Sequence, residues 1–394
     1  MFFQKTKNKI LLGAGIIFAA ALVAFLSVFT VSTDDEFAQL NSKYGLVAVE
    51  SLDESLAPRI ASLFKPDFLR ANLLDFDQPR QELILKLKGE ESGSMADLRN
   101  VLVLNLRTDA DIKKIAAEYS ASKVVEFAEP NFELSADFPP AEIVDSSATK
   151  IRFAFNGEPV LVAVLDSGVD STHPDFAGRI ATGHNFLDDS TDVSDSEGHG
   201  THTAGIILAN SPAAKILPLK ISDGSSGKMR ELVEAIKFAV DHDVQVINLS
   251  LGLKKESRTL REAIDYARAK NVFVVAAAGN YRKDVEYFPA AWSDVFAVSG
   301  LTKRGKKLFL SNFGEWVDFS VVAQDVSAPA PGGEYAFRTG TSQAAPVVSA
   351  KIADFLSVAG KPSIFSEVEN FLIESSELIS GKYLLGRQIL AVSE

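Results

Sequence analysis

The sequence VLVAVLDSG, residues 160–168, contains the clearest strand in the chain. Six apolar residues run without interruption and end at an aspartate, which is followed by a serine and a glycine. A short apolar run bounded by a turn signal is typical of a strand buried on both faces, as in a parallel sheet. In such sheets the chemistry lies at the carboxyl ends of the strands, and this makes Asp166 the first candidate functional residue.

Beyond this strand, the chain alternates apolar runs with helical patterns. Residues 244–249 and 272–278 are two further apolar runs, and residues 229–242 and 258–270 carry apolar side chains at helical spacing. Strands that alternate with helices predict an α/β fold, with a doubly wound parallel sheet covered on both faces. Small and polar residues follow the two later runs, and we expect them at the same edge of the sheet as the aspartate. They are Ser250, Leu251, Gly252, Gly279 and Asn280.

Two further segments complete a set of catalytic residue types. GHGTH, residues 198–202, supplies His199, and GTSQAAP, residues 340–346, supplies Ser342 at the start of a predicted helix. A serine hydroxyl attacks a carbonyl only when an imidazole takes its proton and a carboxylate holds that imidazole in one tautomer. Together with Asp166, these residues predict acyl-transfer chemistry.

In the order Asp, His, Ser and in the residues around each, the chain resembles the subtilisin-like serine proteases, or subtilases. The resemblance extends from about residue 160 to the C-terminus. It implies a serine endopeptidase that acts on polypeptide substrates and needs no cofactor or metal ion for its chemistry. His199 would be the general base, and Asp166 would orient it. Asn280 would donate its side-chain amide to the oxyanion that forms when Ser342 attacks. The substrate strand would lie between two backbone segments, with Gly279 beside them: Ser225, Ser226 and Gly227, and Ser250, Leu251 and Gly252.

The resemblance also indicates where specificity is set. Subtilases wall the pocket for the residue before the cut bond with segments that match residues 250–252 and 277–280, and with the residues before Pro289. Tyr287 stands where many relatives have a small residue. We therefore expect a shallow pocket that favours small or medium apolar side chains.

Some residues near the site have two interpretations. His202 is either a metal ligand together with His199 or a packing residue, and we favour packing because the spacing is not that of HExxH. Asp170 is an alternative orienter of the base. The acidic segment before the histidines forms either a calcium site or a solvated loop, and we favour the loop. Its residues are Asp188, Asp189, Asp192 and Asp195.

Two other function classes compete with an active protease. The first is a catalytically silent binding module with the subtilase fold, and the complete set of catalytic residues argues against it. The second is an esterase that uses the same triad on another scaffold. The chain order and the missing Gly-x-Ser-x-Gly motif disfavour the esterase.

Composition limits the remaining classes. The chain has 394 residues, which suggests two or three domains, and a formal net charge of −12. No basic region is concentrated enough to follow the phosphates of a nucleic acid, so we expect no nucleic-acid partner. The absence of cysteine excludes disulfides, thiolate zinc sites and a lipid-modified cysteine anchor.

The N-terminus predicts a membrane segment within residues 1–33. Lysines at positions 5, 7 and 9 precede an uncharged run at residues 10–31, and a helix of this length spans about 33 Å, enough for a bilayer core. The positive flank is expected to stay cytoplasmic, which makes the rest of the chain extracytoplasmic. A cleaved signal peptide is the alternative, and we favour an uncleaved anchor.

The region between this segment and the catalytic residues predicts a zymogen. Residues 34–80 show no clean period and are either a spacer or an extension of the next domain. Residues 81–138 combine strand and helix patterns, and this small α+β pattern resembles the inhibitory propeptide of secreted subtilases. Residues 139–150 are a polar, proline-containing linker, and residues 151–394 form the catalytic domain. Cutting near the linker would release the enzyme from its anchor and make a secreted form.

Overall fold

The structure is a computed structural model, and it divides into two compact units. It describes residues 35–44, 46–51, 81–88, 100–106, 108–134, 142–144, 159–224, 227–359, 364–379 and 385–389. The first unit ends at Phe132 and the second begins at Glu133. The membrane segment predicted within residues 1–33 lies outside the described residues. Within them, no helix combines the length and the apolar character needed to cross a bilayer.

The first unit is an antiparallel sheet with helices packed against it. Its described elements are α2 (Asp35–Lys43), β1 (Leu46–Ser51), β2 (Gln81–Leu87), β3 (Val101–Leu106), α5 (Ile112–Ser120) and β4 (Val125–Pro130). These strands form one sheet in the order β1-β3-β2-β4, and every neighbouring pair is antiparallel. Asp111 caps α5 by accepting the N–H of Lys113, and the helix buries Ile115, Ala116 and Tyr119.

The segment before β2 contributes to the same core. Phe37 of α2 lies edge-on to Tyr119 of α5, with ring centres 5.7 Å apart, and the Tyr119 hydroxyl donates to the side chain of Asn41. Val49 of β1 is buried in this cluster as well. For residues 34–80, the part that the structure describes therefore supports an extension of the α+β domain over a spacer.

The second unit is built on a mostly parallel sheet. Its described strands are β5 (Glu142–Val144), β6 (Val160–Asp166), β7 (His184–Asn185), β8 (Ala214–Lys220), β9 (Val246–Leu249), β10 (Phe273–Ala277), β11 (Phe296–Leu301), β12 (Phe319–Val322), β13 (Val326–Ala330), β14 (Glu334–Arg338), β15 (Ser376–Leu378) and β16 (Arg387–Ile389). Its described helices are α6 (His199–Asn210), α7 (Met229–Asp241), α8 (Arg258–Ala269), α9 (Thr341–Ala359) and α10 (Phe365–Glu374), with short 3₁₀ turns at Pro174–Phe176 and Pro331–Gly333.

Nine of the described strands form the main sheet, in the order β15-β16-β12-β11-β10-β9-β6-β8-β7. All neighbouring pairs are parallel except β15 with β16. The mostly parallel α/β sheet predicted from the sequence is confirmed.

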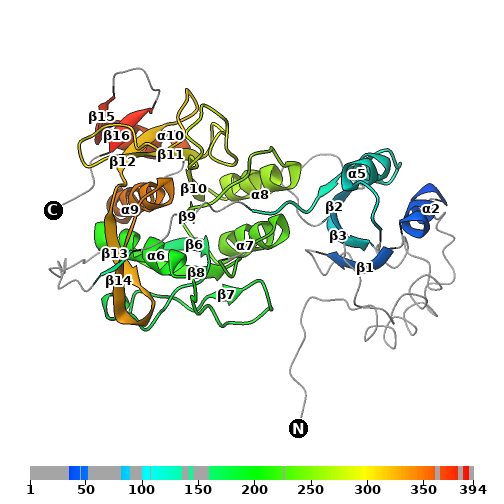
Figure 1. The fold of residues 1–394 in the computed structure, drawn as a ribbon, viewed down its shortest axis with the longest axis horizontal. Helices are drawn as coiled ribbons and strands as arrows, with labels where there is room; N and C mark the ends of the chain where they lie inside the picture. Colours follow the sequence, from blue (N-terminus) through cyan, green and yellow to red (C-terminus); the bar gives the residue numbers. More distant parts are fainter. Residues whose placement is uncertain are drawn as a thin grey trace, which may run out of the picture. The chain divides into compact units, whose positions relative to one another are not determined.

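Helices cover both faces of this sheet. Figure 1 shows α6 and α9 on one side of the strands and α7 and α8 on the other. Alternate residues of β6, Val162 and Val164, belong to the core shared with α6 and α9. On the opposite face α7 buries Leu232, Ile236 and Val240. These residues form the apolar helix face predicted from the spacing in residues 229–242.

The strand order reverses at β6, and this reversal places the candidate site. From β6 the chain fills one side of the sheet with β7 and β8, and then continues on the other side with β9, β10 and β11. A crevice forms at the carboxyl ends of the strands where the order of such a sheet reverses. Asp166 ends β6 and Ser250 directly follows the neighbouring β9, so both lie at this edge.

A smaller sheet packs beside α6. β5 pairs with β14 and β14 pairs with β13, all antiparallel, and the chain passes from β14 almost directly into α9. β5 lies inside residues 139–150, for which we expected a linker. A three-residue strand without a flanking alternation leaves no signal in the sequence, because β14, the strand with which it pairs, lies far along the chain.

Candidate functional site

Asp166 and His199 form a buried hydrogen-bonded pair at the end of β6. Nδ1 of His199 lies 2.8 Å from Oδ1 and 2.9 Å from Oδ2 of Asp166. The carboxylate also accepts the N–H of Ser167 at 2.7 Å. The exposed fractions are 3% for Asp166 and 1% for His199. Because the carboxylate accepts at Nδ1, a neutral imidazole carries its proton there and Nε2 is the basic nitrogen.

Two glycines allow α6 to approach the end of β6 closely. Gly168 has a φ of +113°, a region that side chains rarely adopt, and a Cβ on Gly200 would lie 2.0 Å from the carbonyl oxygen of Gly168. His199 is the first residue of α6, so this contact brings the start of the helix beside Asp166. Both glycines are therefore packing requirements of the Asp–His pair.

Acidic side chains cap the start of α6. Gly198 at the N-cap has no side chain to do so, and the Asp195 carboxylate accepts the N–H groups of Gly198 at 2.7 Å and Thr201 at 2.8 Å. Glu197 accepts the N–H of His199 at 2.7 Å. Asp195 is only 6% exposed. The expectation of a solvated loop is therefore wrong for this residue, which is a buried helix cap.

The other acidic residues near the site have partners of their own. The carboxylate of Asp170, the alternative orienter, accepts the N–H of Gly332 at 2.8 Å. Asp189 lies 3.2 Å from Nε2 of His184. Across the described residues, no group of three or more His, Cys, Asp or Glu side chains is arranged to hold a metal ion.

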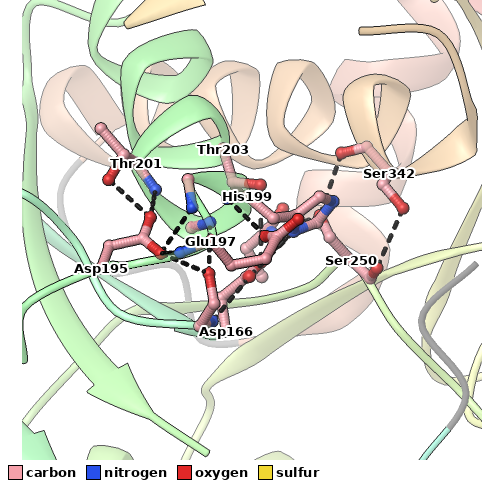
Figure 2. Close-up of polar contacts among 12 residues, drawn as sticks. Asp166, Asp195, Glu197, His199, Thr201, Thr203, Ser250 and Ser342 are labelled. Carbon is pink, nitrogen blue, oxygen red and sulfur yellow. Dashed lines mark hydrogen bonds and ion pairs between the residues drawn. The ribbon is translucent and has the colours of Figure 1, made fainter. Parts of the chain in front are cut away.

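Ser342 is the second residue of α9 and reaches the same edge of the sheet. Its Oγ donates to the carbonyl of Ser250 at 3.0 Å, and Oγ of Ser250 donates to the carbonyl of Ser342 at 3.0 Å. In a regular helix the Ser342 carbonyl would accept the N–H of residue 346, but Pro346 has none. Ser250 takes that place and fixes the start of α9 to the end of β9. Figure 2 shows Asp166, His199 and Ser342 gathered in one cluster.

Asn280 lies beside the start of α9. Its Oδ1 accepts the backbone N–H of Thr341 at 3.0 Å and the Thr341 hydroxyl at 3.1 Å. The Thr341 hydroxyl oxygen in turn accepts the N–H of Gly279 at 3.1 Å. These contacts hold the carbonyl end of the Asn280 amide, so that its nitrogen lies at the opposite end. This orientation suits a donor to an anion that forms at Ser342.

The backbone segments expected to hold a substrate are described in part. Ser225 and Ser226 lie outside the described residues. The carbonyl of Gly227 accepts the N–H of Leu134 at 2.8 Å. The neighbouring residues Glu133 and Lys228 form an antiparallel bridge. This edge therefore pairs with an extended segment of the chain itself. Ser250, Leu251 and Gly252 follow β9, and Gly279 follows β10.

His202 ties α6 to the smaller sheet. It is fully buried, and its Nε2 donates to the carbonyls of Val326 in β13 and Ala336 in β14, both at 3.1 Å. Burial, together with the positive charge of Arg338, lowers the pKa of His202 to about 3, so the ring is neutral at neutral pH. A nitrogen that donates to carbonyls does not bind a metal, and this geometry agrees with a packing role.

Arg338 makes a second link between β14 and the start of α6. Its Nη2 donates to the backbone carbonyl of Glu197 at 3.1 Å, and its Nη1 lies 3.4 Å from Oε1 of the same residue. The Arg338 side chain is only 6% exposed. Arg338 is four residues before Ser342 and Glu197 is two residues before His199. The ion pair therefore joins the segment of Ser342 to that of His199.

Reading the sequence missed the residues that hold the site together. Asp195 and Glu197 stand just before α6, and acidic residues before a helix are a capping signal that would have identified them. Arg338 gave no such signal, because it is 141 residues from its partner in the sequence.

Comparisons with known proteins agree with this geometry. The model of the subtilase family matches residues 157–381. A thermophilic serine proteinase of Bacillus sp. (strain AK1) is 32% identical over 300 residues, which cover 70% of this chain and 74% of the relative. Thermitase of Thermoactinomyces vulgaris is 33% identical over 258 residues, covering 63% and 90%. The crystal structure of a cold adapted subtilisin-like serine proteinase superposes with a TM-score of 0.56 and 26% identity, covering 61% of this chain and 91% of that one.

Proposed function

Because the chain belongs to the subtilase family of serine proteases, we propose that it hydrolyses peptide bonds through Asp166, His199 and Ser342. The observation that carries the proposal is the buried hydrogen bond between Asp166 and Nδ1 of His199, at the sheet edge that also receives Ser342. That bond orients the imidazole so that Nε2 is available as a base.

The reaction follows from these positions. Oγ of Ser342 bonds to the carbonyl carbon of the substrate while His199 takes the hydroxyl proton at Nε2. Asn280 and the backbone N–H of Ser342, at the N-terminus of α9, stabilise the negative oxygen. The carbon–nitrogen bond then breaks as the imidazolium returns the proton to the leaving amine. Water repeats the two steps on the acyl-enzyme and releases the acid.

Two experiments test the proposed activity. A fluorophosphonate probe should label the wild-type chain at Ser342 and should not label Ser342→Ala. A peptide-library digest should then show cleavage of amide bonds. A wild-type chain that is folded but not labelled is the catalytically silent binding module instead, and a labelled chain that cleaves esters but no peptides is an esterase.

The same proposal extends to a zymogen in which the first unit is the inhibitory propeptide. Its antiparallel sheet with α2 and α5 supports this assignment, as does the chain that follows it. There, the N–H of Leu134 donates to Gly227, in a segment expected to bind substrate. An inhibitor that adds a strand to the substrate edge blocks the cleft by main-chain pairing.

Self-maturation has its own test. Purified Ser342→Ala, made free of other proteases, should keep the first unit attached, whereas the wild type should lose it. Normal processing of the alanine variant would show that another protease makes the cut.

We propose further that the zymogen is held at the membrane through residues 1–33, with the catalytic unit extracytoplasmic. A cut between about Asp137 and Lys150 would then release a soluble enzyme. Fractionation decides this point, because the processed species should leave the membrane pellet after high-salt and carbonate washing. A processed species that stays in the pellet would contradict the release model.

A further inference from the structure

The ring of Tyr287 fills a space between two backbone segments of the site. A Cβ placed on Gly252 would lie 2.5 Å from Cε1 and 2.9 Å from Cδ1 of Tyr287. A Cβ placed on Gly279 would lie 3.0 Å from Cδ1 and 3.1 Å from Cγ of the same ring. The tyrosine is 3% exposed. One aromatic ring therefore packs against both glycines and leaves no room for a side chain on either.

Both segments are in contact with the nucleophile's segment. The first contains Ser250, whose carbonyl accepts the Ser342 hydroxyl at 3.0 Å. The second contains Gly279, whose N–H donates to Thr341 at 3.1 Å. The ring thus stands between the segments that follow β9 and β10, both of which contact the start of α9.

A substrate must approach this space during the proposed reaction. Its carbonyl carbon has to lie about 3–3.5 Å from Oγ of Ser342, with its oxygen toward Asn280. The residue that carries this carbonyl then sits over the segments of Ser250 and Gly279. A side chain directed between these two segments would meet the ring of Tyr287.

Backbone pairing of the next residue and a neighbouring aromatic ring hold Tyr287 in place. The next residue, Phe288, exchanges two backbone hydrogen bonds with Leu253, both 2.8 Å long. The ring of Tyr281 lies 5.6 Å from that of Tyr287, and Nζ of Lys254 lies 3.8 Å from the centre of the Tyr281 ring. The ring is therefore part of a packed wall, and a larger substrate side chain would have to displace it at a cost in packing.

We propose that Tyr287 is the residue that determines specificity, and that it restricts the position before the cut bond to glycine, alanine or serine. This inference rests on the proposed peptidase function and names the substrate class of that site. Peptides with a phenylalanine, leucine or arginine at this position should be poor substrates, because their side chains meet the ring.

The test uses peptide amides that differ only in the residue before the cut, which is alanine, phenylalanine or arginine. We expect the wild type to cleave the alanine peptide with a kcat/KM at least about 100-fold above that of the phenylalanine peptide. Tyr287→Ala should raise the ratio of the phenylalanine kcat/KM to the alanine kcat/KM by a comparable factor. Tyr287→Phe is the matched control, because it keeps the ring, and should keep the preference for alanine.

The outcomes separate this inference from the proposed function. The rate of fluorophosphonate labelling at Ser342 reports the triad independently of the pocket. A labelled wild type that cleaves after phenylalanine or arginine as well as after alanine overturns the inference, as does a labelled Tyr287→Ala with an unchanged preference. The wild-type preference still decides the matter when Tyr287→Ala does not fold, and absence of label on the wild type overturns the peptidase proposal instead.

Discussion

Replacing Arg338 by methionine should destabilise the catalytic unit and change the pH dependence of the reaction. The guanidinium group is buried and contacts both the carboxylate and the backbone carbonyl of Glu197. The other oxygen of that carboxylate accepts the N–H of His199 at 2.7 Å. Arg338→Met therefore leaves a partly buried negative charge without its cation at the start of the helix that carries His199.

The structure sets the expected loss of stability and the direction in which the pH profile should move. Removing one partner of a buried ion pair costs about 3–5 kcal/mol, and because Glu197 is 23% exposed, water should reduce the cost to about 2–3 kcal/mol. The charged or titratable groups around the start of α6 include Asp166, Asp195, Glu197, His202 and Arg338. Loss of the Arg338 charge favours added positive charge at the start of α6, so the acid limb of the kcat/KM profile should move to higher pH.

A double-mutant cycle measures the coupling between Arg338 and Glu197. Arg338→Met, Glu197→Gln and the double variant are unfolded with denaturant in a Ser342→Ala background, which prevents self-digestion, and their pH profiles are recorded in the active background. Glu197→Gln should move the acid limb to lower pH, and the double variant should return it toward the wild-type position. Single costs that add within about 0.5 kcal/mol, together with superimposable pH profiles, would refute the reasoning.

Three further outcomes are expected. Asn280→Ala should lower kcat by about 10²–10³ with little change in KM, because the amide acts on charge that develops only in the transition state; an unchanged kcat would remove Asn280 from the mechanism. Burial raises the pKa of Asp318 to about 7, whereas an aspartate in the unfolded chain has a pKa of about 4. The folded state therefore keeps the proton longer, and the free energy of unfolding should fall as the pH rises from about 4 to about 7, by up to about 4 kcal/mol. Asp318→Asn should abolish this fall in denaturation curves at pH 5 and pH 8, and the exposed Asp188→Asn should not; parallel curves for Asp318→Asn and the wild type would contradict the assignment. A folded fragment of residues 35–138 should inhibit the mature enzyme in trans at micromolar concentration, and failure to slow peptide hydrolysis would count against a propeptide.

The sequence predicted those parts of the fold and site that have a local signature. An unbroken apolar run identified β6, and Asp166 could be selected because it directly follows that run. The stripe of Leu232, Ile236 and Val240 identified α7 in the same way. The segment GTSQAAP predicted the start of a helix at Ser342, and α9 begins beside it, at Thr341, with Pro346 inside the helix. Each of these inferences needed only the periodicity of a strand or a helix, or a terminus signal.

The features that escaped prediction depend on contacts between distant segments. β5 becomes a strand only because β14 offers it an edge, and Ile143 lies opposite Ala336, far along the chain. Asp195 looked like one more residue of an acidic loop, although it is buried under the start of α6. Local propensity carries no information about such pairings, since the same residues in a solvated loop would have the same pattern.

The helices of His199 and Ser342 are each held by a polar side chain that donates a hydrogen bond to a backbone carbonyl. In α9, Pro346 withholds an N–H from the carbonyl of Ser342, and the hydroxyl of Ser250 supplies the missing donor. In α6, the neutral ring of His202 donates to the carbonyl of Ala336. That carbonyl belongs to the middle strand of the sheet whose outer strand is β5. β5, which belongs to the second unit, therefore braces the strand that His202 ties to α6. It follows that a maturation cut before Glu142 leaves this support in place, whereas a cut after β5 would remove it from the mature enzyme.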